Sequence, residues 1–127
     1  MQTRVQIVEE ALGVKLPKDY TQWLESEGYY NGEYYEVFGY IEDFEDKQSY
    51  PCIIGATKKI QDHPLITSDD LLLHYDDYLN VLVVLSCRDG CVYNVDFAYR
   101  ARIADNFLTW FNRLKEFEKE IGHNHEV

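Results

Sequence analysis

The chain has few basic residues and no long hydrophobic run, and each shortage excludes a class of partner. Of its 127 residues, 12 are Lys or Arg and 23 are Asp or Glu, so the formal net charge at pH 7 is -11. Nucleic acids and anionic membranes bind clustered Lys and Arg, so neither is expected as a direct partner. The longest nearly uninterrupted apolar run, residues 81–85, is far shorter than the roughly 20 residues that span a membrane.

The cysteines are also few, and they predict reduced thiols. Cys52, Cys87 and Cys91 are odd in number, and the chain does not open with a charged and then apolar signal sequence. Both features favour a cytoplasmic protein over a secreted disulfide framework. A chain of this size buries roughly two-thirds of its unfolded surface, which suffices for one core. We expect a single domain over residues 1–121 and a flexible tail over residues 122–127.

The first third of the chain predicts two capped helices and a strand. Residues 3–6 have the form of a capping box, and Gly13 suits the left-handed residue that ends a helix. Pro17 fits the first position of a second helix, which ends at Gly28. A strand is predicted over residues 34–41. Its alternation places Tyr35, Val37, Gly39 and Ile41 toward the core, and Tyr34, Glu36, Phe38 and Tyr40 away from it.

The middle of the chain predicts short helices and then a hairpin. Residues 53–60 and 68–78 favour helices, the second because a serine at its start offers a cap. Residues 81–86 are apolar at nearly every position, as in a central strand covered on both faces. The turn at Asp89-Gly90 leads into a returning strand, along which four side chains alternate: Cys91, Tyr93, Val95 and Phe97.

The end of the chain predicts one more strand and a long amphipathic helix. The strand covers residues 99–103, and the helix runs from a cap at Asp105 to a stop at Gly122. One face of this helix is apolar: it carries Phe107, Trp110, Phe111, Leu114, Phe117 or Glu118, and Ile121. Together these elements predict an α+β fold, in which a mixed or antiparallel sheet packs against helices in one compact domain.

Between Asp19 and Asp46 the chain is rich in carboxylates and tyrosines and contains no Lys or Arg. Carboxylates attract a basic partner over long distances, and tyrosines provide stiff contact area with a polar tip. The alternatives are a solvated acidic loop and, for Phe38 and Tyr40, packing in the core. The predicted partner-binding residues are Tyr29, Tyr30, Tyr34, Glu36, Phe38, Tyr40, Glu42, Asp43, Glu45, Asp46, Asp76 and Asp77.

Two chemical alternatives compete with binding. Glu36 with Glu42 or Asp43 has the residue types of a glycosidase carboxylate pair, but so many acidic residues give such pairs by chance. Cys87 and Cys91 flank a turn and could form a metal site with His63 or His74. Their spacing differs from that of a Cys-x-x-Cys knuckle, however, and favours buried free thiols. The terminal His123 and His125 define no site. We therefore predict no catalytic residue, cofactor or metal.

Several short motifs follow one another along nearly the whole chain: Leu12-Gly13-x-x-Leu16-Pro17-x-Asp19-Tyr20, Trp23-Leu24, Asn31-Gly32, Val37-Phe38-Gly39, Asp89-Gly90 and Ala104-x-x-Phe107-x-x-Trp110-Phe111. In this order they resemble the sequence landmarks of the SUKH superfamily. Two features differ from that pattern. Leu79-Asn80 stands where a Leu-Pro step commonly precedes the central strand, and the segment 97–104 is short. A strand or hairpin of the family pattern could therefore be missing at the edge of the sheet.

The resemblance implies a compact α+β domain that bacteria use chiefly as an immunity protein. Such proteins bind and neutralise secreted toxins, many of them nucleases, and have no catalytic activity; related fungal regulators of cell-wall synthesis are also binding proteins. The expected function is therefore immunity against a basic toxin, with an intracellular regulatory module as the alternative. No functional residue transfers, and the matching positions are scaffold: Leu12, Gly13, Leu16, Pro17, Tyr20, Gly39, Gly90, Phe107 and Trp110.

Overall fold

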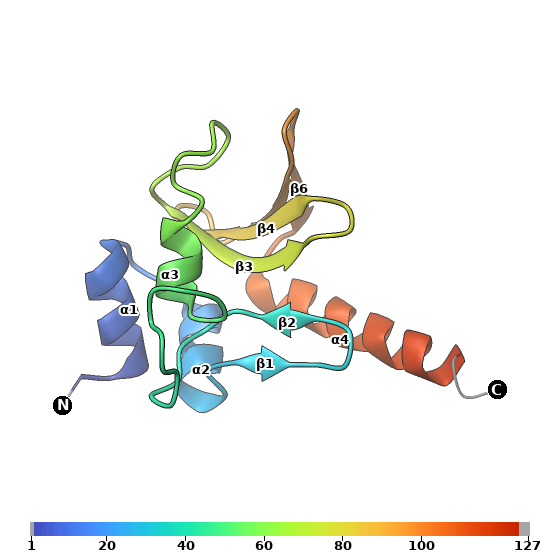
Figure 1. Ribbon diagram of the computed structural model, residues 1–127, viewed down its shortest axis with the longest axis horizontal. Helices are drawn as coiled ribbons and strands as arrows, with labels where there is room; N and C mark the ends of the chain where they lie inside the picture. The colour runs from blue at the N-terminus through green and yellow to red at the C-terminus, as the bar shows by residue number, and fades with distance from the viewer. Residues whose placement is uncertain (1, 125–127) are drawn as a thin grey trace.

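A computed structural model describes the backbone of residues 2–124 and the side chains of residues 2–121 (Figure 1). Within this part, two helices are followed by a pair of strands, a third helix, four more strands and a last helix. The elements are α1 (Arg4–Leu12), α2 (Lys18–Ser26), β1 (Tyr30–Asn31), β2 (Glu36–Val37), α3 (Ile53–Lys58), β3 (Asp70–Asp76), β4 (Val81–Ser86), β5 (Val92–Val95), β6 (Arg100–Ala104) and α4 (Phe107–Asn124). No described helix is long and apolar enough to cross a bilayer.

The larger sheet is a meander in which β3, β4, β5 and β6 pair in chain order, each antiparallel to its neighbour. β4 lies inside this sheet, and its residues 83–86 are buried, as predicted for a central strand. The turn after β4 contains Gly90 with φ 77°, which confirms the hairpin predicted from Asp-Gly. β1 and β2 form a separate two-stranded sheet. The architecture is therefore α+β with antiparallel sheets.

The two N-terminal helices confirm the sequence prediction almost to the residue. Thr3 and Gln6 form a complete capping box before α1, and Gly13 ends it with φ 67°. Pro17 precedes the first helical residue of α2 instead of occupying it. In Figure 1, α1, α2 and α3 lie together at one side of the molecule, while α4 extends to the other side.

The helix predicted over residues 68–78 is wrong, because this segment contains strand β3. Its residues pair with β4, from Asp70 opposite Ser86 to Asp76 opposite Val81. Residues 71–73 are fully buried, and α3 packs against the strand. A serine followed by two aspartates resembles a helix N-terminus locally. Three consecutive leucines that are all buried, however, fit a strand covered on both faces better than a helix.

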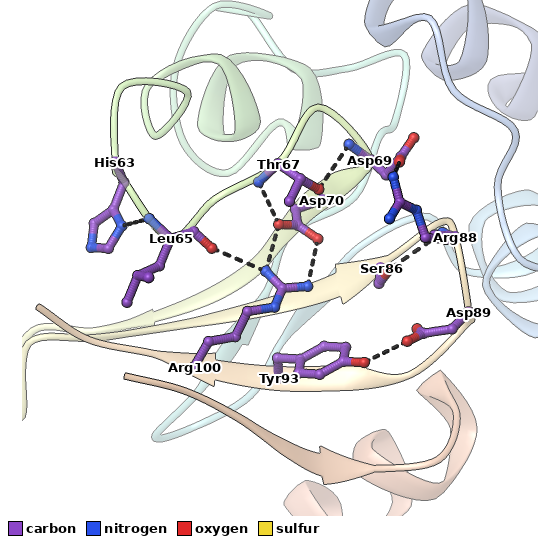
Figure 2. Close-up of polar contacts among 10 residues, drawn as sticks. All are labelled: His63, Leu65, Thr67, Asp69, Asp70, Ser86, Arg88, Asp89, Tyr93 and Arg100. Carbon is purple, nitrogen blue, oxygen red and sulfur yellow. Dashed lines mark hydrogen bonds and ion pairs between the residues drawn. The ribbon is translucent and has the colours of Figure 1, made fainter. Parts of the chain in front are cut away.

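A buried ion pair fixes the start of β3 (Figure 2). The Asp70 carboxylate is 1% exposed and accepts two hydrogen bonds from the Arg100 guanidinium, at 2.6 and 3.0 Å. The same arginine donates to the carbonyl of Leu65 and lies 4.2 Å from the ring centre of Tyr93. The Thr67 amide also donates to Asp70. Because each charge has several partners, this bidentate pair can remain buried and joins β6 to the beginning of β3.

Of the strand predicted over residues 34–41, only the two residues of β2 have strand conformation. The predicted assignment of its side chains to an inward and an outward face is therefore partly wrong. Phe38 and Tyr40 are 4% and 8% exposed, so both lie in the core, which was the alternative reading of the sequence. Leu73 has no partner in β4, and its carbonyl instead accepts the Phe38 amide at 2.7 Å. After this contact the chain leaves strand geometry, and the two-residue alternation stops.

Gly39 allows two backbone segments to cross at this point. A Cβ atom on Gly39 would lie 1.7 Å from the carbonyl oxygen of Gly28. The adjacent Tyr40 amide donates to that same oxygen at 2.7 Å, while the Gly39 carbonyl accepts the Ile53 amide at 2.7 Å. Because the crossing is held from both sides, only a residue without a side chain fits. It connects the end of α2 to the beginning of α3.

An aromatic cluster joins α2 to α4 at the centre of the core. Tyr20 and Trp23 contact the ring of Phe107 with centroid distances of 5.0 and 5.1 Å, and Phe111 extends the cluster. Tyr20 is fully buried, and its hydroxyl donates to the Phe38 carbonyl at 3.1 Å. These contacts confirm the apolar faces predicted for both helices.

Three details of the C-terminal half differ from the prediction. The cap of α4 is Asn106, not Asp105, because the Asn106 side chain accepts the Thr109 amide at 2.8 Å. Gly122 does not end the helix, which continues to Asn124; residues 125–127 lie outside the described part of the chain. Phe97 is 81% exposed, since strand β5 ends at Val95.

Candidate functional site

A groove lined mainly by aromatic rings opens beside the β1–β2 hairpin and β3. It has a volume of about 300 Å³. We call it the aromatic groove; it is lined by Tyr34, Glu36, Phe38, Tyr50, His74, Tyr75 and Asp77. Tyr34, Tyr50 and Tyr75 keep 40%, 42% and 37% of their surface exposed, so their rings are accessible to a ligand. Among the described residues, two carboxylates and no Lys or Arg belong to this lining, which makes it acidic.

A second hollow of about 440 Å³ adjoins the aromatic groove and extends it toward the turn between β3 and β4. It shares four lining residues with the groove. Tyr78 and Leu79 form part of its wall and are 91% and 64% exposed. Exposed apolar surface next to carboxylates is typical of protein-binding sites.

Hydrogen bonds fix the side chains that belong to β3. His74 Nδ1 lies 2.8 Å from the Glu36 carbonyl oxygen, and because a carbonyl only accepts, Nδ1 carries the proton. The Tyr75 hydroxyl donates to Asn80 Oδ1 at 2.7 Å. Asp76 accepts the amides of Tyr78 and Leu79 in the following turn. One wall of the groove is therefore preorganised by the sheet.

The part of the lining that comes from the β1–β2 hairpin is held by one buried carboxylate from α4. Glu118 is 8% exposed and accepts the Tyr30 hydroxyl at 2.5 Å, the Tyr34 amide at 2.8 Å and the Tyr35 amide at 3.3 Å. A Cβ atom on Gly32 would lie 2.2 Å from a Glu118 oxygen, so the hairpin turn approaches the carboxylate closely. These bonds position Tyr34 at the groove.

Tyr29 and Tyr30 are half-buried and contribute mainly to this support. Tyr29 donates to the Glu36 carboxylate and packs against Phe44. Burial, followed by that hydrogen bond, raises the pKa of Tyr29 well above its usual value. Burial and the bond to Glu118 likewise raise the pKa of Tyr30 to about 12. Both phenols therefore remain neutral hydrogen-bond donors at physiological pH.

The residues 42–46, which we call the acidic loop, lie near two cations that are absent from their own stretch of sequence. Arg4 donates to both oxygens of the Glu42 carboxylate at 3.1 Å, and this interaction lowers the pKa of Glu42. Lys47 donates to the backbone carbonyls of Glu42 and Phe44, which closes the loop. Part of the local negative charge is therefore neutralised.

Three further carboxylates of the acidic stretch stabilise the fold. Asp19 accepts the Leu108 amide at 3.0 Å, at the start of α4, and Glu25 accepts the Val5 amide at 2.6 Å, at the start of α1. Both place negative charge at the positive end of a helix. Glu27 accepts the indole N–H of Trp23. The charge run is thus partly a set of structural contacts, which sequence alone does not reveal.

The structure brings together some of the predicted partner-binding residues and separates others. Tyr34, Glu36, Phe38 and Asp77 line the aromatic groove, and Asp76 lines the adjoining hollow. Tyr40 belongs to the core, and the exposed residues of the acidic loop lie outside both linings. The prediction missed the groove residues Tyr50, His74 and Tyr75. His74 and Tyr75 were missed because their segment was predicted to be helical, whereas it forms β3.

The two chemical alternatives gain no support from the geometry. Glu42 is held by Arg4 and Glu36 by Tyr29, so the proposed carboxylate pair has two separate environments. All three cysteines are free thiols, and burial raises the pKa of Cys87 to about 12. Among the described residues, no three His, Cys, Asp or Glu side chains gather as metal ligands would.

The fold and the groove define a small α+β domain with an acidic, aromatic concave surface. Residues 2–113 match the SMI1 / KNR4 family (SUKH-1), and this chain belongs to that family. The match covers all elements from α1 through the beginning of α4, and it confirms the resemblance drawn from the sequence motifs. No curated individual protein matches the chain.

Proposed function

We propose that this protein is an immunity protein that binds a basic secreted toxin, of the nuclease class, and neutralises it without catalysing a reaction. The observation that supports this proposal is the aromatic groove, where exposed tyrosine rings and carboxylates meet on one concave surface. Tyrosine is enriched among residues that dominate binding energy, and carboxylates select a basic partner. SUKH membership agrees with a binding role.

The charge of the molecule supports a nuclease as the partner. A nuclease holds phosphates with a positively charged surface, and a protein with a net charge of -11 is attracted to that surface. The Asp43, Glu45 and Asp77 side chains accept no hydrogen bond from a described residue. Bound near the nuclease active site, such carboxylates would occupy positions that substrate phosphates require.

The proposal is tested by affinity capture from the native host at low salt, followed by identification and purification of the bound protein. We expect a basic protein whose nuclease activity falls to zero at one equivalent of the immunity protein. A toxin gene next to the gene for this chain would agree with that result. Capture of a protein that is not basic, or that keeps its activity in the complex, would instead favour the regulatory module.

Tyr34 is the proposed anchor residue in the complex. Its ring is 40% exposed at the groove, and its backbone amide is held by Glu118. Replacing Tyr34 with Ala removes the ring and keeps the backbone contact, so we expect dissociation of the captured partner to accelerate, at a cost of about 2 kcal/mol. Surface plasmon resonance measures both rates. Tyr99→Ala, which removes a ring that is 54% exposed outside the groove, is the control. Equal dissociation rates for the two variants would remove Tyr34 from the interface.

A further inference from the structure

We propose that the aromatic groove binds the guanidinium group of an arginine side chain. This inference rests on the proposed function, because the arginine would belong to the basic partner. It adds the chemistry of the contact: one arginine side chain lies against tyrosine rings and pairs with a carboxylate. The following geometric and electrostatic observations support it.

The groove has the charge and the size for one cationic side chain. Its carboxylates are Glu36 and Asp77, and the adjoining hollow adds Asp76. Glu36 is bound by Tyr29, and Asp76 accepts two backbone amides. No described residue donates a hydrogen bond to the exposed Asp77 carboxylate, so it can pair with a ligand. The volume of about 300 Å³ lies at the lower limit of small-ligand clefts.

Aromatic rings in the lining favour a planar cation. Guanidinium stacks on ring faces, is more weakly hydrated than ammonium and forms two parallel hydrogen bonds to a carboxylate. Tyr34 and Tyr75 offer partly exposed rings, and the Tyr75 hydroxyl is already bound to Asn80, which fixes the ring in place. The combination of stacking surface and a nearby carboxylate therefore selects arginine over lysine.

The protein already places three of its own cations over tyrosine rings, and two of these contacts bear on the groove. Lys59 Nζ lies 5.2 Å from the ring centre of Tyr50, at the groove, and the Arg100 guanidinium lies 4.2 Å from that of Tyr93 in the large sheet. The Arg100 contact also includes a bidentate carboxylate, Asp70. Arg100 thus shows inside this same chain the geometry that we infer for the groove.

The test is a titration of the full chain with N-acetyl-arginine amide, followed by NMR of the tyrosine and histidine side chains. N-acetyl-citrulline amide, which has the same shape without the charge, and N-acetyl-lysine amide are the controls. We expect saturable shifts at Tyr34, His74 and Tyr75 with the arginine compound, several-fold weaker binding of the lysine compound and no saturation with citrulline. Equal responses to arginine and citrulline, or tighter binding of lysine, would overturn the inference.

Matched variants locate the site. Asp77→Asn should weaken binding of the arginine compound about fivefold, as for the loss of one partly exposed ion pair, whereas Glu45→Gln in the acidic loop should leave it unchanged. Tyr75→Phe should retain binding and Tyr75→Ala should abolish it. Binding that is lost in Tyr75→Phe but retained in Tyr75→Ala would overturn the inference. The probe needs no toxin, so its failure leaves the proposed function standing. Absence of a basic partner would refute the proposed function, and with it the partner's arginine as the occupant, even if the groove binds the arginine compound.

Discussion

At the scale of single residues, the phenol of Tyr30 provides a pH-dependent measure of the hairpin contact. Its folded pKa is about 12, above the ordinary tyrosine value of about 10. Between these values the unfolded chain has lost a proton that the folded chain keeps, so the contribution of Tyr30 to stability is complete below about pH 10 and falls as the pH rises toward 12. Difference absorbance between the parent and Tyr30→Phe should show one group ionising near pH 12. Ionisation near the ordinary value would contradict the burial of this phenol and its contact with Glu118.

Glu118 is the acceptor in that contact, and its two oxygens serve one hydroxyl and two backbone amides. Glu118→Gln removes the charge and leaves one acceptor oxygen for the Tyr30 hydroxyl and the amides of Tyr34 and Tyr35, so at least one of these hydrogen bonds is lost and those of the two amides are weakened. We expect the free energy of unfolding to fall by about 1 to 3 kcal/mol, and hydrogen exchange at these two amides to accelerate. Denaturant titration and exchange NMR measure the two effects. Glu116→Gln, exposed on the same helix, is the matched control, and equal effects would refute the role of Glu118.

At the scale of secondary-structure elements, the crossing of Gly28 and Gly39 connects α2, the strand β2 and α3. Gly39→Ala would place a methyl group 1.7 Å from a backbone oxygen that cannot rotate away. We expect a loss of about 3 kcal/mol or more, at the upper end of overpacking effects. Gly13→Ala is the control, because its Cβ meets no atom within 4 Å and only the φ of 67° opposes it, at about 1 to 2 kcal/mol. Thermal unfolding should rank the two variants in this order; the opposite order would contradict the crossing.

Elements whose conformation depends on neighbouring residues were predictable from the sequence. Elements whose conformation depends on contacts with residues far away in the chain were not. The capping box of Thr3, the turn at Gly90 and the apolar strand β4 each depend on neighbouring residues, and all three are confirmed. The segment of β3 was predicted to be helical because its strand conformation depends on pairing with β4 and on the ion pair of Asp70 with Arg100, 30 residues away. The aromatic groove was only partly predicted for the same reason, since its rings come from three separate segments.

At the scale of the whole molecule, the fold redistributes the charge that the sequence places in one stretch. The chain between Asp19 and Asp46 contains no cation, yet Arg4 neutralises Glu42, and three other carboxylates bind backbone amides or an indole. Of the remaining carboxylates in this stretch, Asp43, Glu45 and Asp46 lie in the acidic loop, Glu36 lines the groove, and Glu33 is exposed between β1 and β2. Long-range attraction and short-range contact are therefore expected to depend on different residues.

Charge reversal in the acidic loop should separate these two contributions. Glu45→Lys should slow association with the captured basic partner, most strongly at low salt, and leave the dissociation rate nearly unchanged, because steering affects encounter more than the final contact. Asp62→Lys is the control: it makes the same change in net charge in the α3–β3 loop, at the opposite end of α3 from the acidic loop (Figure 1). Stopped-flow mixing at several salt concentrations measures the rates. If both variants slow association equally, net charge alone steers the partner, whereas a larger effect of Glu45→Lys assigns steering to the acidic loop.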